Sequence, residues 1–293
     1  MRLSLFSSPP RPGKPASPLA VACALLGVVL AGLASAARAD LTIFSQSVET
    51  ENGITQKPTT ETTFIKGEIT RTELMNDKRE MFVVIHDLMS DNVFYLVPAH
   101  RLCATFNNRS DLMRMAPALQ VIKENMKITG VADVKPGGKT KMIAGKLTKN
   151  YKYSTTMRIV VKGRPEKFAT IKMTGEQWVT GDLKLSPELQ RKQHASSLRS
   201  LGPYASAAKP LLDKQARIAR GYVLEDKYTL TIASTLEVAP GAGGTQETST
   251  THMTVTEIKN ESLDDKLFVV PSSYREVAPE PSMLPQNFYT FTL

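Results

Sequence analysis

The stretch Thr229-Leu-Thr-Ile-Ala-Ser-Thr-Leu-Glu-Val238 decides the fold class, because apolar and polar side chains alternate along it with a period of two. Leu230, Ile232, Leu236 and Val238 fall on one side, and threonine and glutamate fall on the other. This pattern predicts a β-strand with one dry face and one wet face, which is typical of an antiparallel sheet.

Working outward, further runs rich in Thr, Val, Ile and aromatic residues predict strands, and Gly, Pro, Asn or Asp residues separate most of them. These runs cover residues 41–50, 59–75, 81–88, 92–97, 100–106, 128–135, 140–145, 151–162, 167–180 and 247–258. About eleven strands with mostly short connections predict a mainly β protein, a curved antiparallel sheet rolled into a barrel or half-barrel.

Two segments interrupt the β pattern and predict helices that cover the sheet. In residues 110–127, Pro117 suits a first helical turn, and Leu119, Ile122 and Met126 repeat at helical spacing. In residues 186–220, Ser186 is a candidate N-cap, while Gly202-Pro203 and Pro210 predict a division into two or three short helices.

Residues 1–39 have the pattern of a secretory signal peptide. Basic residues precede an apolar run at 19–33, and the small-x-small motif Ala37-Arg-Ala39 follows it. The alternative is an uncleaved anchor, but the run is shorter than the roughly 20 residues of a spanning helix. Cys23 lies near the start of the run, unlike the cysteine of a lipoprotein. We therefore expect cleavage after Ala39 and a periplasmic or secreted chain.

The expected mature chain is one β domain over residues 40–293, with an irregular tail from about residue 279. Residues 1–39 hold four of the 37 basic residues and no acidic one, so the remainder carries 33 basic against 28 acidic residues, a net charge of +5. The segment 186–220 alone accounts for that excess. Its basic residues are candidates for contact with an anionic membrane surface or an envelope protein: Arg191, Lys192, Arg199, Lys209, Lys214, Arg217 and Arg220.

Several motifs in the chain resemble those of a known family. The runs Thr59–Glu73, Val83–Leu88 and Asn92–Pro98, and the later Ser262–Pro271, are similar to the hairpins of a secreted bacterial family known only as a domain of unknown function. That family is related to the LolA/LolB-like lipoprotein-carrier half-barrels. The resemblance implies a curved antiparallel sheet that is covered by helices and can hold acyl chains, and it supplies no catalytic residue.

The motifs that could suggest an enzyme are incomplete. Gly137-Gly-Lys-Thr140 imitates part of a phosphate loop, but the upstream glycine would fall at Asp133, so we interpret the segment as a hairpin turn. The four histidines are scattered, and no Gly-x-Ser-x-Gly elbow is present. The sequence therefore predicts neither an enzyme, a cofactor nor a metal site, and the basic segment has too few aromatic residues for nucleic-acid binding.

Two functions fit these patterns. The first is a binding or carrier protein for a lipid or acyl chain, held in a half-barrel cavity. Its candidate lining residues are Met157, Ile159, Trp178, Leu230, Ile232, Leu236, Leu119, Ile122 and Met126. The alternative is a structural or interaction protein of the cell envelope, whose core is filled by its own side chains and whose basic helices form the contact surface.

Overall fold

The computed structural model describes residues 40–51, 53–75, 80–107, 125–183, 185, 189, 205–235 and 245–278. The predicted signal peptide, nearly all of the predicted helix at 110–127 and the predicted tail beyond residue 279 lie outside these residues. Among the described residues, no helix is both long enough and apolar enough to cross a membrane.

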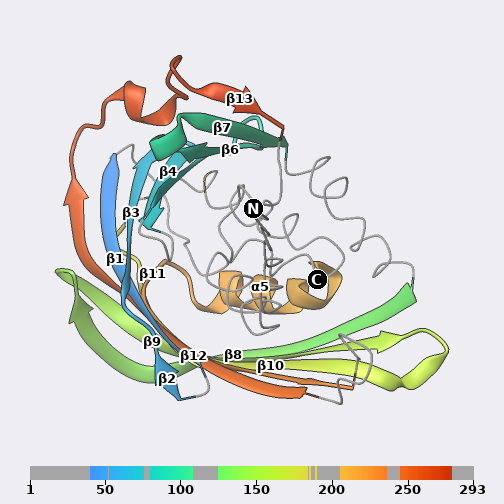
Figure 1. Cartoon of the computed structure of the whole chain (residues 1–293). Coiled ribbons are helices and arrows are strands. Elements are labelled where there is room, and N and C mark those ends of the chain that lie inside the picture. The colour runs from blue at the N-terminus through green and yellow to red at the C-terminus, as the bar shows by residue number, and fades with distance from the viewer. Residues whose placement is uncertain are drawn as a thin grey trace, which may run out of the picture.

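The described residues form one strongly curved, unclosed sheet (Figure 1). It has 13 strands, and the prediction of a mainly β, curved antiparallel architecture is confirmed. The strands are β1 (Leu41–Glu51), β2 (Ile54–Thr55), β3 (Thr59–Lys66), β4 (Ile69–Met75), β5 (Met81–Asp87), β6 (Asn92–Val97), β7 (Leu102–Asn107), β8 (Met126–Ile143), β9 (Lys146–Val161), β10 (Arg164–Thr180), β11 (Tyr222–Ser234), β12 (Thr245–Asn260) and β13 (Arg275–Val277).

Two meanders make up this sheet. The short strands β3 to β7 and the long strands β8 to β12 each pair with their sequence neighbours, and β1 joins the two sets by pairing with both β3 and β12. All pairs are antiparallel except β13 with β7. The edges β8 and β13 do not pair with each other, so the sheet stays open.

Two expectations about turns were wrong. The run 59–75 is two strands, because Gly67 adopts a φ of +60° in the tight turn between β3 and β4. Pro136-Gly137-Gly138 is not a hairpin turn but a bulge inside β8, where the register against β9 shifts between Pro136 and Thr140. Both flanks keep their pairing with β9, so the extra residues bend the strand instead of ending it.

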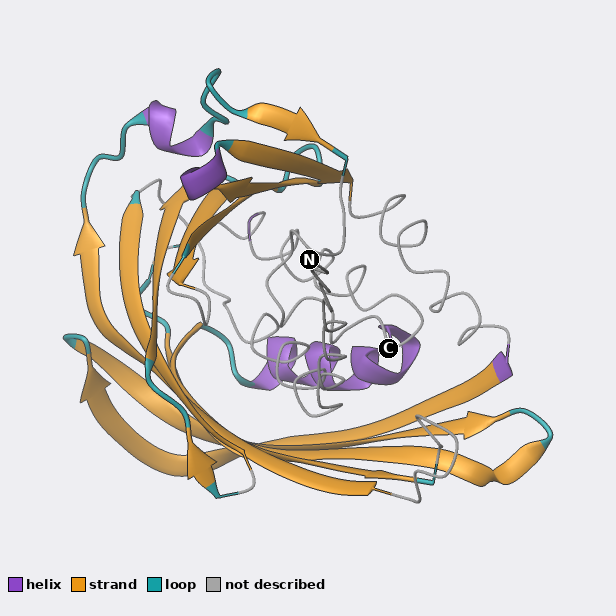
Figure 2. Cartoon of the chain, in the orientation of Figure 1, coloured by secondary structure: helices purple, strands orange, loops and turns teal. Residues whose placement is uncertain are grey.

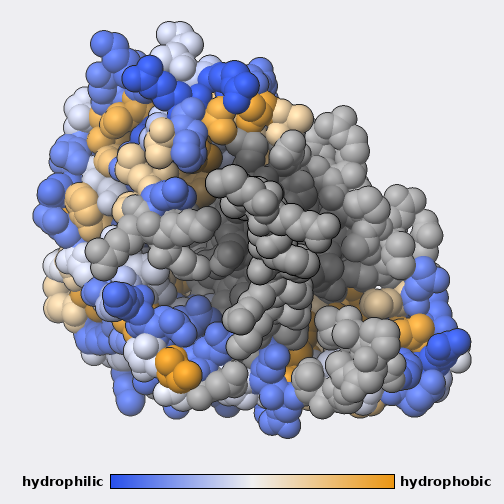
Figure 3. Space-filling model, in the orientation of Figure 1, coloured by the Kyte–Doolittle hydropathy of each residue, from blue (hydrophilic) through white to orange (hydrophobic). Residues whose placement is uncertain are grey.

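The concave side of the long strands, here called the inner face, is apolar, and the convex or outer face is mainly polar except at the end that carries Trp178. On β9, the side chains of Tyr153, Met157 and Ile159 are buried, whereas those of Lys152, next to Tyr153, and Arg158, between Met157 and Ile159, are exposed. This is the alternation that the sequence predicts for a half-buried sheet. Hydrophilic residues cover much of the described surface in the space-filling view (Figure 3).

The C-terminal segment covers the outer face of the short strands. Val83, Ile85, Leu96 and Cys103 form a buried cluster there, against which Val270 and Tyr274 pack. The short 3-10 helices are η1 (Pro98–His100) and η3 (Asp265–Phe268). The other side of the same strands carries a second apolar cluster that includes Tyr95 and Phe106, whose rings meet edge to face at 4.9 Å. The short strands are therefore packed on both sides.

The helix α5 (Ala205–Ile218) lies on the concave side of the sheet and packs mainly against β8 (Figures 1 and 2). The ammonium of Lys214 is 2.8 Å from Asp133 Oδ1 and donates to the carbonyl of Ala132 at 3.2 Å, which ties the helix to the sheet. Pro210 lies inside α5, so the predicted break there was wrong. A proline removes one backbone hydrogen bond, which bends a helix without necessarily ending it.

Candidate functional site

The inner face of β9, β10 and β11 forms a continuous apolar strip. Met157 on β9 lies opposite Ile171 on β10, which lies opposite Ile232 on β11. One step along the strip, Met173 pairs with Leu230, and both are fully buried. Ile159 continues the strip opposite Ala169. The structure thus brings together four of the residues proposed from sequence: Met157, Ile159, Leu230 and Ile232.

Met126 also faces this strip, but from a different element than expected. It is the first residue of β8 and pairs with Val161, in phase with Ile128 opposite Ile159. The prediction that Met126 belongs to a covering helix was therefore wrong, because its alternation with Ile128 places it in the strand pattern. Leu119, Ile122 and Leu236 lie outside the described residues.

Trp178 does not join the strip. It is five residues from Met173 on the regularly paired strand β10, and an odd separation places two side chains on opposite faces. Its indole lies 4.2 Å from the ammonium of Lys141, a cation–π contact, within a buried cluster that includes Leu183 and Leu224. Trp178 therefore stabilises the end of the sheet where the β8–β9 hairpin packs.

A buried polar group, which sequence reasoning missed, interrupts the inner strip. Asp226 on β11 and Gln177 on β10 lie directly opposite each other, and each is only 1% exposed. The hydroxyl of Tyr153 on β9 donates to Asp226 Oδ1 at 2.9 Å across the intervening strand. The signal in the sequence was the position of Asp226, in phase with the apolar residues Tyr228, Leu230 and Ile232.

Gly175 leaves room for the contact between Tyr153 and Asp226. A Cβ atom at this position would lie 2.8 Å from Cζ of Tyr153 and 2.7 Å from the backbone oxygen of Lys227. The tyrosine ring can therefore cross β10 only where the strand has no side chain. This close approach connects β9 to β11 through the polar group.

The environment changes the acidity of both partners. Burial raises the pKa of Asp226 to about 7, and the hydrogen bond from Tyr153 offsets only part of that rise. Burial, together with the adjacent Asp226 carboxylate, raises the pKa of Tyr153 well above its ordinary value. Near neutral pH, Asp226 can therefore exchange a proton inside the apolar strip, while Tyr153 stays a neutral donor.

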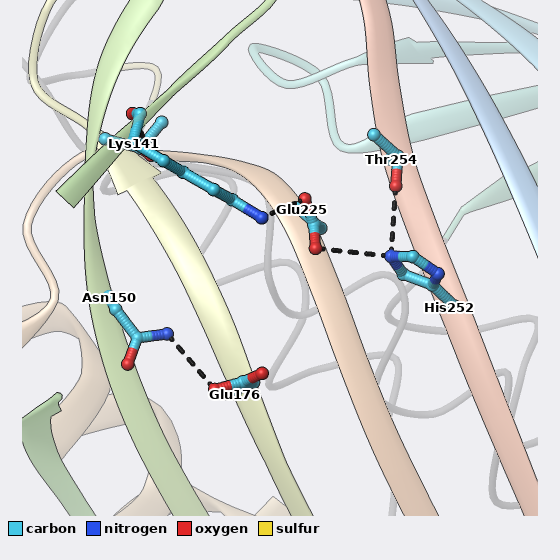
Figure 4. Close-up of polar contacts among 7 residues, drawn as sticks. Lys141, Asn150, Glu176, Glu225, His252 and Thr254 are labelled. Carbon is cyan, nitrogen blue, oxygen red and sulfur yellow. Dashed lines mark hydrogen bonds and ion pairs between the residues drawn. The ribbon is translucent and has the colours of Figure 1, made fainter. Parts of the chain in front are cut away.

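A separate polar network ties strands β8, β11 and β12 together (Figure 4). Lys141 Nζ lies 2.6 Å from Glu225 Oε2, and Glu225 Oε1 lies 3.3 Å from His252 Nε2, which is 3.2 Å from the hydroxyl of Thr254. His252 is nearly half exposed. The network has no buried nucleophile, and its geometry is that of cross-strand ion pairs.

Part of the predicted basic contact surface lies along a groove between α5 and β8. Lys209, Lys214 and Arg217 line this groove, of about 460 Å³, together with Ala132, Pro210 and Asp213. Lys209 pairs with Asp213 and Lys214 with Asp133, which offsets two of the three charges. Arg220 is exposed just beyond the helix, whereas Arg191, Lys192 and Arg199 lie outside the described residues.

Metal ligands are not grouped in the part of the chain that the structure describes. No three His, Cys, Asp or Glu side chains there lie close enough to hold an ion. Cys103 is buried in the cluster beneath Tyr274, and burial raises the pKa of its thiol, which disfavours the reactive thiolate.

No family model matches the chain, and no curated protein matches it. Among solved structures, the chain is similar to a LolA superfamily protein from Nitrosomonas europaea, at 6% identity and a TM-score of 0.28, covering 85% of this chain and 97% of that one. It is also similar to a DUF1329 family protein from Desulfovibrio piger, at 11% identity and a TM-score of 0.28, covering 86% and 95%. These descriptions agree with the family that the sequence motifs resemble. Because the TM-scores are this low, the similarities carry no argument about function, which depends on the chain's own residues.

Proposed function

We propose that the protein is an exported, non-enzymatic binding or carrier protein that holds an apolar ligand, a lipid or an acyl chain, against the inner face of its sheet. The observation that carries this proposal is the inner strip itself. Apolar side chains from β8, β9, β10 and β11 share one concave surface, while the other face of the same strands is mainly polar except at the end that carries Trp178. A concave, mainly apolar surface with few polar groups is the usual form of a small-ligand site.

The polar interruption is consistent with a binding site. A sheet that serves only as a core has no need of an acidic side chain at an inward position, since burying a carboxyl group costs free energy. Here Asp226 and Gln177 occupy inward positions at one end of the strip, and the Tyr153 hydroxyl donates to Asp226. Binding sites are commonly apolar with a small number of placed polar groups that orient the ligand.

A second function has a specific observation in its favour. Met173 and Leu230 are completely buried in the folded chain, as they would be in a filled core. In this alternative the protein is a structural or interaction protein of the cell envelope. The groove beside α5, lined by Lys209, Lys214 and Arg217, would then be its contact surface for anionic head groups or an envelope protein.

Organic extraction separates the two functions. We expect protein that is purified without detergent to release lipid into an organic phase, in an amount approaching one molecule per chain by mass spectrometry. Protein that is unfolded, washed and refolded serves as the control, and it should be lipid-free and take lipid up again from vesicles. A native preparation without lipid that also fails to take lipid up would support the filled-core alternative.

A further inference from the structure

Two buried acceptors face each other within the apolar inner strip. Asp226 and Gln177 are register partners on β11 and β10, so their side chains share one face at the separation of directly paired residues. Both are 1% exposed. Their neighbours on the same face are apolar or aromatic, with Val179 on one side of Gln177 and Tyr228 beside Asp226.

The hydrogen-bonding capacity of this pair is only partly used. Asp226 Oδ1 accepts from the Tyr153 hydroxyl at 2.9 Å. Gln177 Oε1 is buried and accepts no hydrogen bond from any residue in the described part of the chain. The ionised carboxylate of Asp226 has no proton to donate to Gln177 Oε1. A buried acceptor without a donor destabilises a fold, so the unmet acceptor beside an ionised Asp226 indicates a donor that arrives from outside.

The pair also lies at one end of the apolar strip. Gln177 and Ile171 are six residues apart on β10, so the strip extends about 20 Å from the polar pair at the rise of a β-strand. Met173 and Leu230 lie along that path, opposite each other. A polar end followed by a long apolar path matches the shape of a single-chain amphiphile.

We propose that Gln177 and Asp226 bind the hydrogen-bond-donating head group, an ammonium or a hydroxyl, of a ligand whose apolar tail lies along Met173 and Leu230. This inference rests on the proposed function and adds the head-group chemistry to it. An ammonium or hydroxyl supplies the donor that Gln177 Oε1 lacks, and an ammonium also complements the carboxylate of Asp226. A carboxylate head supplies only acceptors, so a fatty acid fits this end of the strip poorly.

Three probes with the same ten-carbon tail test the proposal: decylamine, decanol and decanoate. In calorimetric titrations of the folded, lipid-free chain, we expect decylamine and decanol to bind about tenfold or more tightly than decanoate, as one added hydrogen bond to a charged or buried acceptor predicts. Gln177→Met keeps the length of the side chain and removes the acceptor, so it should abolish the advantage of decanol. Asp226→Asn should lower the affinity for decylamine more than the affinity for decanol, because it removes the negative charge.

Glu225→Gln is the matched control, since it removes a carboxylate from the adjacent residue on the other face of β11 and should leave all three affinities unchanged. Equal affinities for the three probes, insensitive to either variant, would overturn the head-group inference and leave the proposed function standing. No binding of any probe would overturn both. If Gln177→Met does not fold, as circular dichroism would show, the response of the Asp226→Asn variant decides the inference alone.

Discussion

At the scale of single residues, Asp226 couples the stability of the chain to pH. Its pKa is about 7 in the folded state because of burial, against 3.8 for an exposed aspartate. Between these values the unfolded chain binds fewer protons than the folded chain, so the unfolding free energy falls as the pH rises. Over the full window the loss amounts to about 4 kcal/mol.

We therefore expect Asp226→Asn, which keeps the shape and can still accept from Tyr153, to remove this pH dependence and to be more stable than the parent above pH 7. Urea unfolding at pH 5 and pH 8 measures the effect. The difference in stability between variant and parent should grow from pH 5 to pH 8. A difference that stays constant between the two pH values would mean that Asp226 ionises at its ordinary pKa in the folded chain.

Gly175 offers a second test at this scale. An alanine there would place its Cβ 2.7 Å from the backbone oxygen of Lys227 and 2.8 Å from the ring of Tyr153. Because backbone atoms cannot move aside cheaply, we expect Gly175→Ala to cost about 1–3 kcal/mol of unfolding free energy. Gly181→Ala, whose Cβ would meet nothing within 4 Å, is the control and should change stability by less than about 0.5 kcal/mol. Equal effects of the two substitutions would contradict the close packing of Tyr153 over β10.

At the scale of elements, side-chain alternation was enough to predict most strands and the inward direction of Met157, Ile159, Leu230 and Ile232. It could not predict how strands end, because a Pro-Gly-Gly segment suits both a turn and a bulge, and only pairing on both sides of Pro136 distinguishes them. Sequence reasoning placed Met126 in a helix instead of in β8 for a related reason. A short apolar run at a boundary fits a helix and a strand equally well.

Sequence reasoning placed Trp178 with the ligand because its type suits a cavity rim, whereas its phase against Met173 places it on the other face. Sequence reasoning could not identify the pair of Gln177 and Asp226, for a different reason. The two residues are far apart in the sequence, and only the register of β10 against β11 brings them together. A polar residue at an inward position was the sole local sign of the site.

The basic contact surface on helix α5 can be tested by vesicle binding. We expect weak binding to anionic vesicles that fades as the salt concentration rises, since each basic residue near such a surface contributes about 1 kcal/mol. Changing Lys209, Arg217 and Arg220 to Glu should abolish the binding to anionic vesicles. Lys214 is left intact because it ties α5 to β8 through Asp133.

The control for this triple variant reverses the same number of charges elsewhere. Lys152, Lys172 and Lys227 are exposed on the outer face of β9, β10 and β11. Vesicle sedimentation at low and physiological salt compares the two triple variants. If both lose binding equally, the attraction reflects net charge alone and α5 is not a contact surface.

Asp40, the residue that would follow the expected cleavage site, contacts the C-terminal segment. Its side chain accepts from the backbone amide of Leu263 at 3.0 Å, and its carbonyl accepts from the backbone amide of Glu261 at 3.3 Å. Leu41, which follows, is 2% exposed in β1. Cleavage after Ala39 would thus release a chain whose first residue already pairs with the C-terminal segment.

The intact mass of the exported protein tests this expectation. We expect a mass that corresponds to a chain starting at Asp40 and lacking any lipid adduct. Export of the chain in a bacterial host, followed by mass spectrometry of the periplasmic fraction, gives the answer. A chain that starts at an acylated Cys23 would overturn both the cleavage site and the free, unanchored state.

At the scale of the whole molecule, the sheet is curved and unclosed. Its edges β8 and β13 do not pair, and the inner strip lies on the concave side of the curve (Figure 2). The sequence predicted such a curved sheet from about eleven alternating strands with mostly short connections.

Photo-crosslinking with an alkyl diazirine tests the central claim most directly, because the carbene attaches to whatever side chains line the site. After loading the folded chain and irradiating it, peptide mass spectrometry should locate the adducts on the inner positions Met157, Met173 and Leu230, with competition by unlabelled lipid. Outer-face residues of the same peptides, such as Arg158 and Thr229, should stay unmodified. Adducts confined to the outer face, or no saturable labelling at all, would contradict the account of an apolar ligand held inside the curved sheet.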